Sequence, residues 1–289
     1  MTQKAEPMTD TLTVDLRERY IDLMKKTLSF SLWKNPGIPL EELNLRRRYP
    51  PVVRVMIDVV ARLARSAGLE IARRPANESA KEEGRIWPVL ADTMIGLKRL
   101  DNLQFCVETV LRDGIPGDLI ETGVWRGGSC IFMRSILMAY GVSNRRIFVA
   151  DSFKGLPKPD KKKYPQDSPD KLFTVSYLAV SRESVESNFA KYGLLDKQVV
   201  FLEGWFKDTL PTAPIEKLSV MRLDGDMYQS TMDVLTHLYP KLSIGGFCII
   251  DDYGLPGCRL AIDDFRKQQG VKAPLQNVDW TGAFWRKEQ

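Results

Sequence analysis

The sequence of 289 residues has little of the chemistry that builds zinc centres or disulfide frameworks. It contains one histidine, His237, and four cysteines without CxxC spacing. His237 falls within a helical pattern, and we interpret it as structural. The cysteines are interpreted as reduced, mostly buried thiols of a cytoplasmic protein. They are Cys106, Cys130, Cys248 and Cys258.

Long apolar runs and a strong excess of one charge are also missing. No run reaches the length of a transmembrane helix, and the first residues contain no apolar signal core. The net charge is only +5, and the short basic clusters lack interleaved aromatic residues, so we expect no nucleic-acid partner. With 44% hydrophobic and 27% charged residues, the chain is expected to form one sizeable core.

The pattern along the chain changes near residue 85. Residues 1–85 are predicted to form a helical extension, which includes an amphipathic basic helix after Pro50. Such helices usually pack on their own domain or on a second subunit, so we expect a capping or oligomer-forming role and a homo-oligomer. Contact of this helix with a membrane surface is the less favoured alternative. Residues 86–289 are predicted to form the main domain.

Short apolar runs alternate with helical patterns in this main domain. The predicted strands are "DLIETG", "RIFVADS", "QVVFLEG", "LSVMRLD" and "GGFCIIDDY". Apolar strands that alternate with helices are typical of a doubly wound, Rossmann-like α/β domain with a parallel sheet. Ligands of such sheets bind at the carboxyl ends of the strands, where each predicted strand here has an acid or a glycine. The long loop over residues 154–183 is predicted to cover a substrate there.

A glycine-rich turn, "ETGVWRGGS", follows the first predicted strand. Its spacing is not that of a dinucleotide site, and no Walker lysine follows it, so a tight turn without a ligand is the plain alternative. Asp151 ends the next strand, however, where an acid binds ribose in nucleoside sites. Glu121, before the turn, would repel phosphates and could accept a hydrogen bond from an ammonium group. The two acids favour S-adenosylmethionine over NAD.

Two acidic pairs end the last two predicted parallel strands. They are Asp224 and Asp226 in "RLDGDMY", and Asp251 and Asp252 in "IIDDYG". A single acid at such a position often caps the following helix. Four carboxylates at neighbouring strand ends repel one another unless a cation lies between them. Oxygen ligands without histidine suit Mg²⁺ better than zinc.

Longer stretches of residues 85–289 resemble the macrocin-type O-methyltransferases, and they occur in a consistent order. They are "TMIGLKRLDNLQ", "GDLIETGVWRGGSCIFMR", "VADSFKGLP", "GWFKDTLP", "MRLDGDMY" and "IIDDYGLPGCRLAIDDFR". The resemblance implies a class I methyltransferase fold with an antiparallel last strand, here "GAFWRKE". It also implies S-adenosylmethionine as cofactor and Mg²⁺ or a similar divalent cation. The implied acceptor is a sugar hydroxyl of a glycosylated natural product or a glycan.

The resemblance also implies roles for individual residues. Asp224, Asp251 and Asp252 match the metal ligands. Asp226 matches the general base, with Asp224 acting beside it in catalysis, and Gly225 is expected to turn Asp226 away from the metal. The cofactor would be held by Thr93, Met94, Glu121, Thr122, Gly123, Trp125, Ser129, Asp151, Ser152, Gly204 and Trp205.

Two other functions stay open at this point. A catechol-type O-methyltransferase acting on a small diol would need the same acids, because the diol would also chelate a cation. A non-catalytic nucleoside-binding module, with the helical extension as its interaction part, is disfavoured by the intact acidic motifs.

Overall fold

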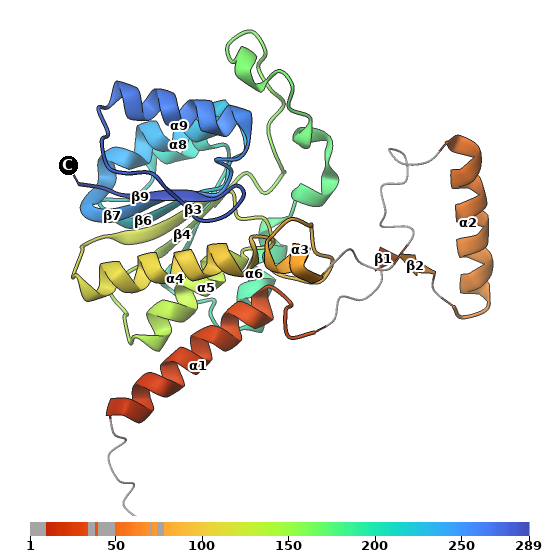
Figure 1. Cartoon of the computed structure of the whole chain (residues 1–289), viewed down its shortest axis with the longest axis horizontal. Helices are drawn as coiled ribbons and strands as arrows, with labels where there is room; N and C mark the ends of the chain where they lie inside the picture. The colour runs from red at the N-terminus through yellow and green to blue at the C-terminus, as the bar shows by residue number, and fades with distance from the viewer. Residues whose placement is uncertain (1–9, 34–37, 40–49, 70, 74–77, 289) are drawn as a thin grey trace, which may run out of the picture.

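The centre of the molecule is a seven-stranded sheet with the order β5-β4-β3-β6-β7-β9-β8 (Figure 1). The structure, a computed structural model, describes residues 10–33, 38–39, 50–69, 71–73 and 78–288. The strands of the sheet are β3 (Asp118–Thr122), β4 (Ile147–Asp151), β5 (Val199–Glu203), β6 (Leu218–Leu223), β7 (Leu242–Ile250), β8 (Gln276–Asn277) and β9 (Ala283–Arg286).

Strands β3 to β7 run parallel, and β9 pairs antiparallel with β7. This confirms the predicted doubly wound sheet with an antiparallel last strand. The edge strand β8 was not predicted, because two residues are too few to show an alternating pattern. The chain builds outward from β3 in both directions, first through β4 and β5, then through β6 and β7. The order of the strands therefore reverses beside β3, where ligands of such sheets bind.

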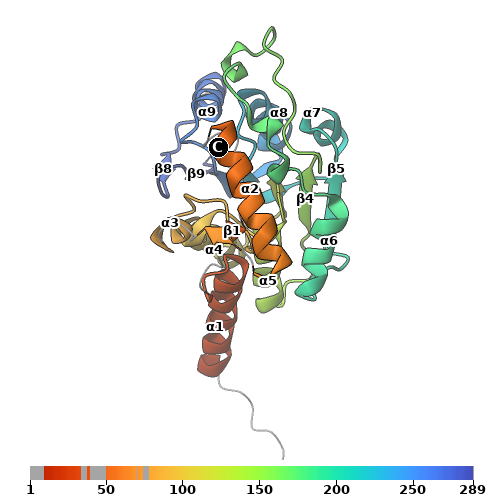
Figure 2. The same ribbon diagram turned by 90° about the vertical axis from the view of Figure 1, so that its right-hand side faces the viewer.

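Helices cover both faces of the sheet (Figures 1 and 2). Helices α4 and α5 lie on one face, and α8 and α9 on the other. The helices are α1 (Asp10–Leu28), α2 (Pro51–Ser66), α3 (Glu78–Glu82), α4 (Gly96–Arg112), α5 (Gly128–Ala139), α6 (Arg182–Lys191), α7 (Phe206–Thr209), α8 (Tyr228–Leu238) and α9 (Pro256–Gln268). A separate two-stranded pair joins β1 (Ile38–Pro39) to β2 (Ala72–Arg73).

Successive residues of each strand face opposite layers of the domain. In β4, Ile147 and Val149 pack with the residues of α4 and α5, whereas Phe148 packs with those of α8 and α9. All three side chains are fully buried. Because both faces of the sheet are covered, β3 to β7 are mostly apolar and do not alternate regularly with polar residues.

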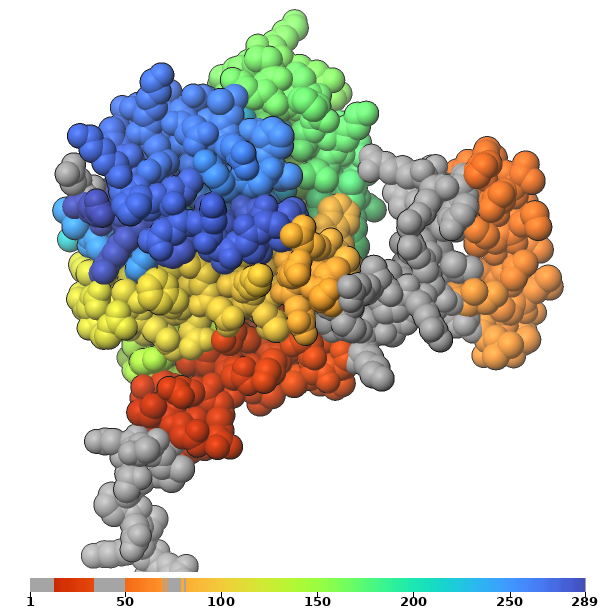
Figure 3. All heavy atoms as spheres, in the orientation of Figure 1, coloured from red at the N-terminus to blue at the C-terminus, as the bar shows by residue number. Residues whose placement is uncertain are grey.

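Helix α1 packs on the layered domain, although it lies within the predicted extension. Ile21, Met24 and Leu28 are buried in the cluster that contains α4 and α5, and Figure 3 shows α1 lying against that layer. The carbonyl of Leu28 accepts hydrogen bonds from the backbone N–H groups of Asp92 and Thr93, at 2.9 and 3.2 Å. The end of α1 thus supports the segment that precedes α4.

Helix α2 presents apolar side chains to solvent, and Figure 1 draws it apart from the layered domain. Val52, Val55, Met56, Val59 and Leu63 are between 48% and 72% exposed. Of the two long helices before residue 85, α1 packs on the layered domain, whereas α2 is exposed. The domain boundary near residue 85 therefore stays a prediction. Among the described residues, no helix is both long and apolar enough to cross a bilayer.

We expect Leu28→Ala to lower the free energy of unfolding by about 2–5 kcal/mol, because it removes a fully buried side chain from the core. Denaturant unfolding would measure the change. Leu23→Ala is the matched control, because Leu23 lies on the same helix and is 52% exposed; its effect should stay within about 0.5 kcal/mol. Equal effects of the two variants would show that α1 does not pack as described.

Candidate active site

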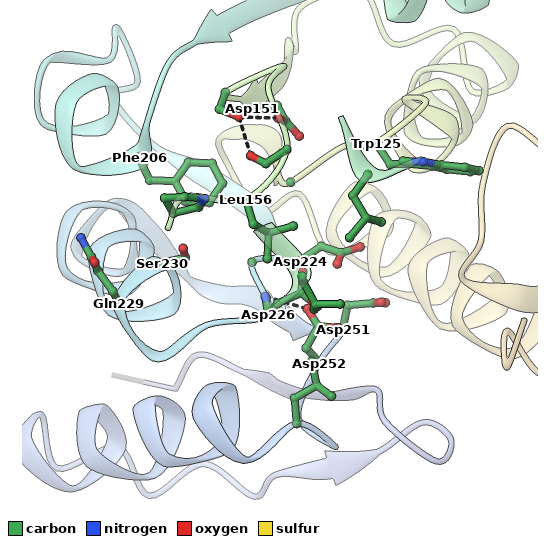
Figure 4. Close-up of a pocket in the computed structure, with 18 of the residues that line it drawn as sticks. Trp125, Asp151, Leu156, Phe206, Asp224, Asp226, Gln229, Ser230, Asp251 and Asp252 are labelled. Atoms are coloured by element: carbon green, nitrogen blue, oxygen red, sulfur yellow. Dashed lines mark hydrogen bonds between the residues drawn. The ribbon is translucent and has the colours of Figure 1, made fainter. Parts of the chain in front are cut away.

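A cavity of about 510 Å³ opens at the carboxyl ends of the parallel strands (Figure 4). Its volume is in the range of small-molecule and cofactor sites. It gathers most of the residues that the sequence predicted for cofactor and metal: Met94, Gly123, Trp125, Asp151, Ser152, Gly204, Trp205, Asp224, Asp226, Asp251 and Asp252. Four other predicted residues are buried and do not line the cavity: Thr93, Glu121, Thr122 and Ser129.

Gly123 allows the ends of β3 and β6 to approach closely. Its φ is +87°, and a Cβ at this position would lie 1.8 Å from the carbonyl oxygen of Asp224. The N–H of Asp224 donates to the carbonyl of Thr122 at 2.9 Å. A side chain at residue 123 would therefore push the turn away from the acidic strand end.

Asp151 is held rigidly at the end of β4. Its Oδ2 accepts a hydrogen bond from Val124 N–H and its Oδ1 from Phe153 N–H, both at 2.8 Å. Desolvation raises the pKa of Asp151, and the backbone hydrogen bonds oppose this shift. Each carboxylate oxygen has a second lone pair, so the group can still accept from a ligand hydroxyl. Gly204 N–H donates to the Asp151 carbonyl at 2.9 Å, which places the end of β5 beside it.

The loop over residues 154–183 is anchored next to the glycine turn. It contains three 3₁₀ turns: Pro165–Asp167, Leu172–Thr174 and Ser176–Leu178. Trp125 Nε1 donates to the carbonyl of Tyr177 at 3.0 Å, and the rings of Trp87 and Tyr177 stack at 5.6 Å. The hydroxyl of Tyr177 donates to the carbonyl of Pro88. The loop thus forms part of the cavity wall, and its role as a substrate cover stays a prediction.

Three of the four predicted acids at the ends of β6 and β7 converge. Asp224, Asp226 and Asp252 each offer an oxygen, and these oxygens lie within 4.8 Å of one another. The N–H of Asp226 also donates to Asp252 Oδ2 at 3.1 Å. The left-handed residue of this turn is Asp226, with a φ of +56°, and not Gly225. The expectation that Gly225 lets Asp226 face the acceptor hydroxyl instead of the metal stays a prediction.

Asp251 lies in a different setting from the other three acids. One of its oxygens pairs with Arg99 and the other with Arg222. Arg99 also pairs with Asp279, at 3.1 Å, and donates to the carbonyl of Gly84. The structure therefore brings Asp224 and Asp252 together as predicted, with Asp226 near them and Asp251 tied to arginines. The metal-ligand set stays a prediction.

Arg222 is the central residue that the sequence reasoning missed. It lies within β6 and is 1% exposed. It pairs with Glu121, with Asp251 and, at 2.9 Å, with Asp224. The signal was present in "LSVMRL", because an arginine inside a buried strand must have carboxylate partners.

Burial and these contacts shift the pKa values of the acids along the carboxyl ends of the strands, which we call the acidic rim. Desolvation raises the pKa of Glu121 to about 7, while Arg222 and the Cys130 thiol oppose this. Desolvation and Asp251 raise the pKa of Asp224 to about 6, against Arg222. Desolvation and neighbouring carboxylates raise the pKa values of Asp226 and Asp252 well above the ordinary range. The excess of acid favours the binding of cations at this rim.

The fold and the site together define a class I methyltransferase. The glycine turn follows the first strand, an acid ends the second, and the sheet closes with an antiparallel strand. The chain belongs to the macrocin-O-methyltransferase (TylF) family, whose model matches residues 17–287. It is therefore an O-methyltransferase of an S-adenosylmethionine-dependent family. The match begins within α1, so it extends beyond the region in which the sequence showed the resemblance.

Relatives and a solved structure agree with this assignment. The chain is 48% identical over 276 residues to the 8-demethyl-8-(2,3-dimethoxy-alpha-L-rhamnosyl)-tetracenomycin-C 4'-O-methyltransferase of Streptomyces olivaceus, covering 95% of each chain. It is 54% identical over 213 residues to the mycinamicin III 3''-O-methyltransferase of Micromonospora griseorubida, covering 73% of this chain and 84% of the relative. The structure of the O-methyltransferase NovP aligns with a TM-score of 0.81 at 43% identity, over 94% of this chain and 100% of that one.

The raised pKa values predict how Mg²⁺ affects stability at different pH. The pKa values of these acids are higher in the folded than in the unfolded protein. The protonated acids therefore contribute to the stability of the fold, and this contribution is lost as the pH rises through their pKa values in the folded protein, about 6 for Asp224. A cation that binds the ionised cluster offsets this loss. We expect Mg²⁺ to raise the melting temperature more at pH 8 than at pH 5.5, as measured by thermal unfolding. Asp224→Asn should remove the difference, and an equal Mg²⁺ effect at both pH values would contradict it.

Proposed function

We propose that this protein transfers the methyl group of S-adenosylmethionine to a sugar hydroxyl of a small glycosylated natural product or glycan, with a divalent cation bound at the acidic cluster. The observation that carries the proposal is that one cavity contains both the glycine turn with Asp151 and the cluster around Asp224. Figure 4 shows Asp151 on one side and the four strand-end acids on the other. Methyl transfer requires that the methyl donor and the acceptor hydroxyl lie together in one enclosed site.

The cofactor is proposed to lie across the ends of β3, β4 and β5. Asp151 is placed to accept from the ribose hydroxyls, with Ser152 beside it, and Trp205 and Gly204 would flank the adenine. Met94, Gly123 and Trp125 line the same cavity and would contact the methionine part. Thr93, Glu121, Thr122 and Ser129, which were also predicted to hold the cofactor, are buried and do not line the cavity.

The donor set at the cluster fits a hard divalent cation. Carboxylate oxygens of Asp224, Asp226 and Asp252 lie within 4.8 Å of one another, and oxygen ligands are those that Mg²⁺ prefers. Asp224 and Asp252 belong to the predicted ligand set, whereas Asp251, the third member, is held by Arg99 and Arg222. When bound, the cation would stabilise negative charge on the acceptor oxygen.

Asp226 is proposed as the general base. Desolvation and the nearby carboxylates raise its pKa, which makes the ionised carboxylate a stronger proton acceptor. The acceptor hydroxyl gives its proton to an Asp226 oxygen as its own oxygen bonds to the methyl carbon. S-adenosylmethionine, when bound, would supply that carbon from its sulfonium sulfur and would be released as S-adenosylhomocysteine. The walls of the cavity would hold the two reactants in line.

The sugar acceptor rests on the relatives. The Streptomyces olivaceus enzyme is named for a rhamnosyl-tetracenomycin, and this supports a glycoside as the acceptor of the present chain. The cavity also has apolar wall groups, among them Trp87, Leu178 and Trp280, which suit the non-sugar part of such a molecule.

Two variants separate the roles proposed for the acids. Asp226→Asn should lower kcat about 100-fold or more and spare S-adenosylmethionine binding, because it removes the proton acceptor and keeps the shape. Asp224→Ala should abolish turnover and the response to Mg²⁺. Steady-state kinetics with a glycoside acceptor and calorimetric cofactor titration would measure both effects. Wild-type kcat for Asp226→Asn across the pH range would remove it as base, and normal turnover of Asp224→Ala would remove the metal assignment.

We also propose that the protein is a cytoplasmic homo-oligomer and that residues 1–85 contribute to its assembly. The cytoplasmic location is supported by the four cysteines, all of which are free and buried. Assembly is supported by α2, whose stripe of exposed apolar side chains suits burial against a second copy.

A double charge substitution on this stripe tests the assembly. Val59→Glu with Leu63→Glu should reduce the particle to a monomer of 32.9 kDa, because buried unpaired carboxylates oppose association. Size-exclusion chromatography with light scattering would measure the mass. Arg62→Gln, an exposed change on the same helix, is the control. A monomeric wild-type protein, or an unchanged mass for the double variant, would contradict the proposal.

A further inference from the structure

Asp167 is a buried carboxylate in the loop over residues 154–183, and none of the roles above involves it. The residue is 2% exposed. Its Oδ1 accepts a hydrogen bond from Tyr228 N–H at 2.7 Å, and its Oδ2 accepts one from Gln229 N–H at 3.0 Å. These are the first two residues of α8. Asp167 therefore caps this helix from a segment 61 residues earlier in the chain.

Helix α8 has no cap of its own. The residue at its N-cap position is Met227, and no side chain of the local sequence caps the helix. Ser, Thr, Asp and Asn are the usual residues there, because their oxygens accept from the first free N–H groups. Asp167, which lies in the loop over residues 154–183, supplies this cap instead. The start of α8 therefore depends on how that loop packs against it.

The residue before the N-cap of α8 has a strained backbone. Asp226 has a φ of +56°, a left-handed conformation that non-glycine residues seldom adopt and that persists where surrounding contacts hold it. On one side, Asp226 N–H is held by Asp252 Oδ2 at 3.1 Å. On the other side, two residues later, Tyr228 N–H is held by Asp167. The proposed base thus lies between two carboxylate anchors.

The loop over residues 154–183, the start of α8 and the start of α9 pack closely around Asp167. A Cβ at Gly257, in the first turn of α9, would lie 3.2 Å from Asp167 Oδ1 and 3.3 Å from Tyr228 N. In the same loop, Tyr164 lines the cavity, and its ring lies 6.2 Å from that of Tyr228. The loop, the start of α8 and the start of α9 therefore pack as one unit beside the acidic cluster.

We propose that Asp167 is a positioning residue for Asp226. It holds the left-handed turn that places the Asp226 carboxylate in the cluster, and it joins the docking of the loop to the completion of the acceptor site. Asp167 does not touch the reacting atoms. The inference rests on the proposed role of Asp226 as base, and the experiment below separates the two.

The test is a double-mutant cycle. Asp167→Ala should lower kcat for methyl transfer about 10- to 100-fold, because it releases the turn that orients the base, and it should leave the affinity for S-adenosylmethionine unchanged. In the Asp226→Asn background, Asp167→Ala should cause no further loss of kcat, because the carboxylate it positions is already gone. Asp167→Asn keeps one acceptor oxygen for Tyr228 N–H and should restore part of kcat.

Ser181→Ala is the matched control for the loss of a helix cap. The Ser181 hydroxyl caps α6, accepting from Ser184 N–H at 3.3 Å, and Ser181 does not line the cavity. This variant should lower the melting temperature, as other cap deletions do, and keep wild-type kcat. Thermal unfolding of all variants would show that the change in kcat does not follow stability alone.

The following outcomes decide the question. Wild-type kcat for Asp167→Ala, or an equal loss with and without Asp226→Asn, would overturn the positioning role and leave the base assignment intact. Wild-type kcat for Asp226→Asn would overturn the base assignment itself. Should Asp167→Ala fail to fold, Asp167→Asn carries the cycle: a loss of kcat that vanishes in the Asp226→Asn background supports the proposal, and any other result opposes it.

Discussion

The ion pairs of Arg222 are the interaction on which the acidic rim depends. The arginine is fully buried in β6 and contacts carboxylates at the ends of three neighbouring strands, Glu121, Asp224 and Asp251. Without it, these like charges would oppose the close pairing of β3, β6 and β7 at this edge. The ion pairs of Arg222 do not include Asp226 or Asp252, so these two acids have less positive charge near them. The sulfonium cofactor and the divalent cation of the proposed reaction would carry the positive charge that is missing.

The backbone turns around this rim are as demanding as its charges. Gly123 lets the first turn pass against the carbonyl of Asp224, and Asp226 adopts a left-handed conformation without being a glycine. Strain of this kind persists where surrounding contacts hold it, and here two carboxylates, on Asp252 and Asp167, hold the turn. The long loop is consequently built into the site, with one anchor at Tyr177 and the other at Asp167.

Much of the fold could be read from the local pattern. The apolar runs that end at Thr122, Asp151 and Leu223 became parallel strands, because strands buried on both faces are mostly apolar. The chain order of glycine turn and acids also located the cavity, since parallel strands end at one edge. Two features could not be found in this way. β8 is too short to show a period, and the packing of α1 depends on a partner helix far along the chain, α5.

The sequence by itself determined which residues reach the carboxyl edge, because strand direction and the position of each acid after its strand are local properties. Only the tertiary structure decided which side chains each of those acids contacts. Asp251 turns to Arg99 and Arg222, whereas Asp226 joins Asp224 and Asp252, because the partners of each carboxylate come from distant elements. The same reason explains why Asp167 and Arg222 were missed: a cap or a counter-ion supplied from another element leaves no spacing pattern in the chain.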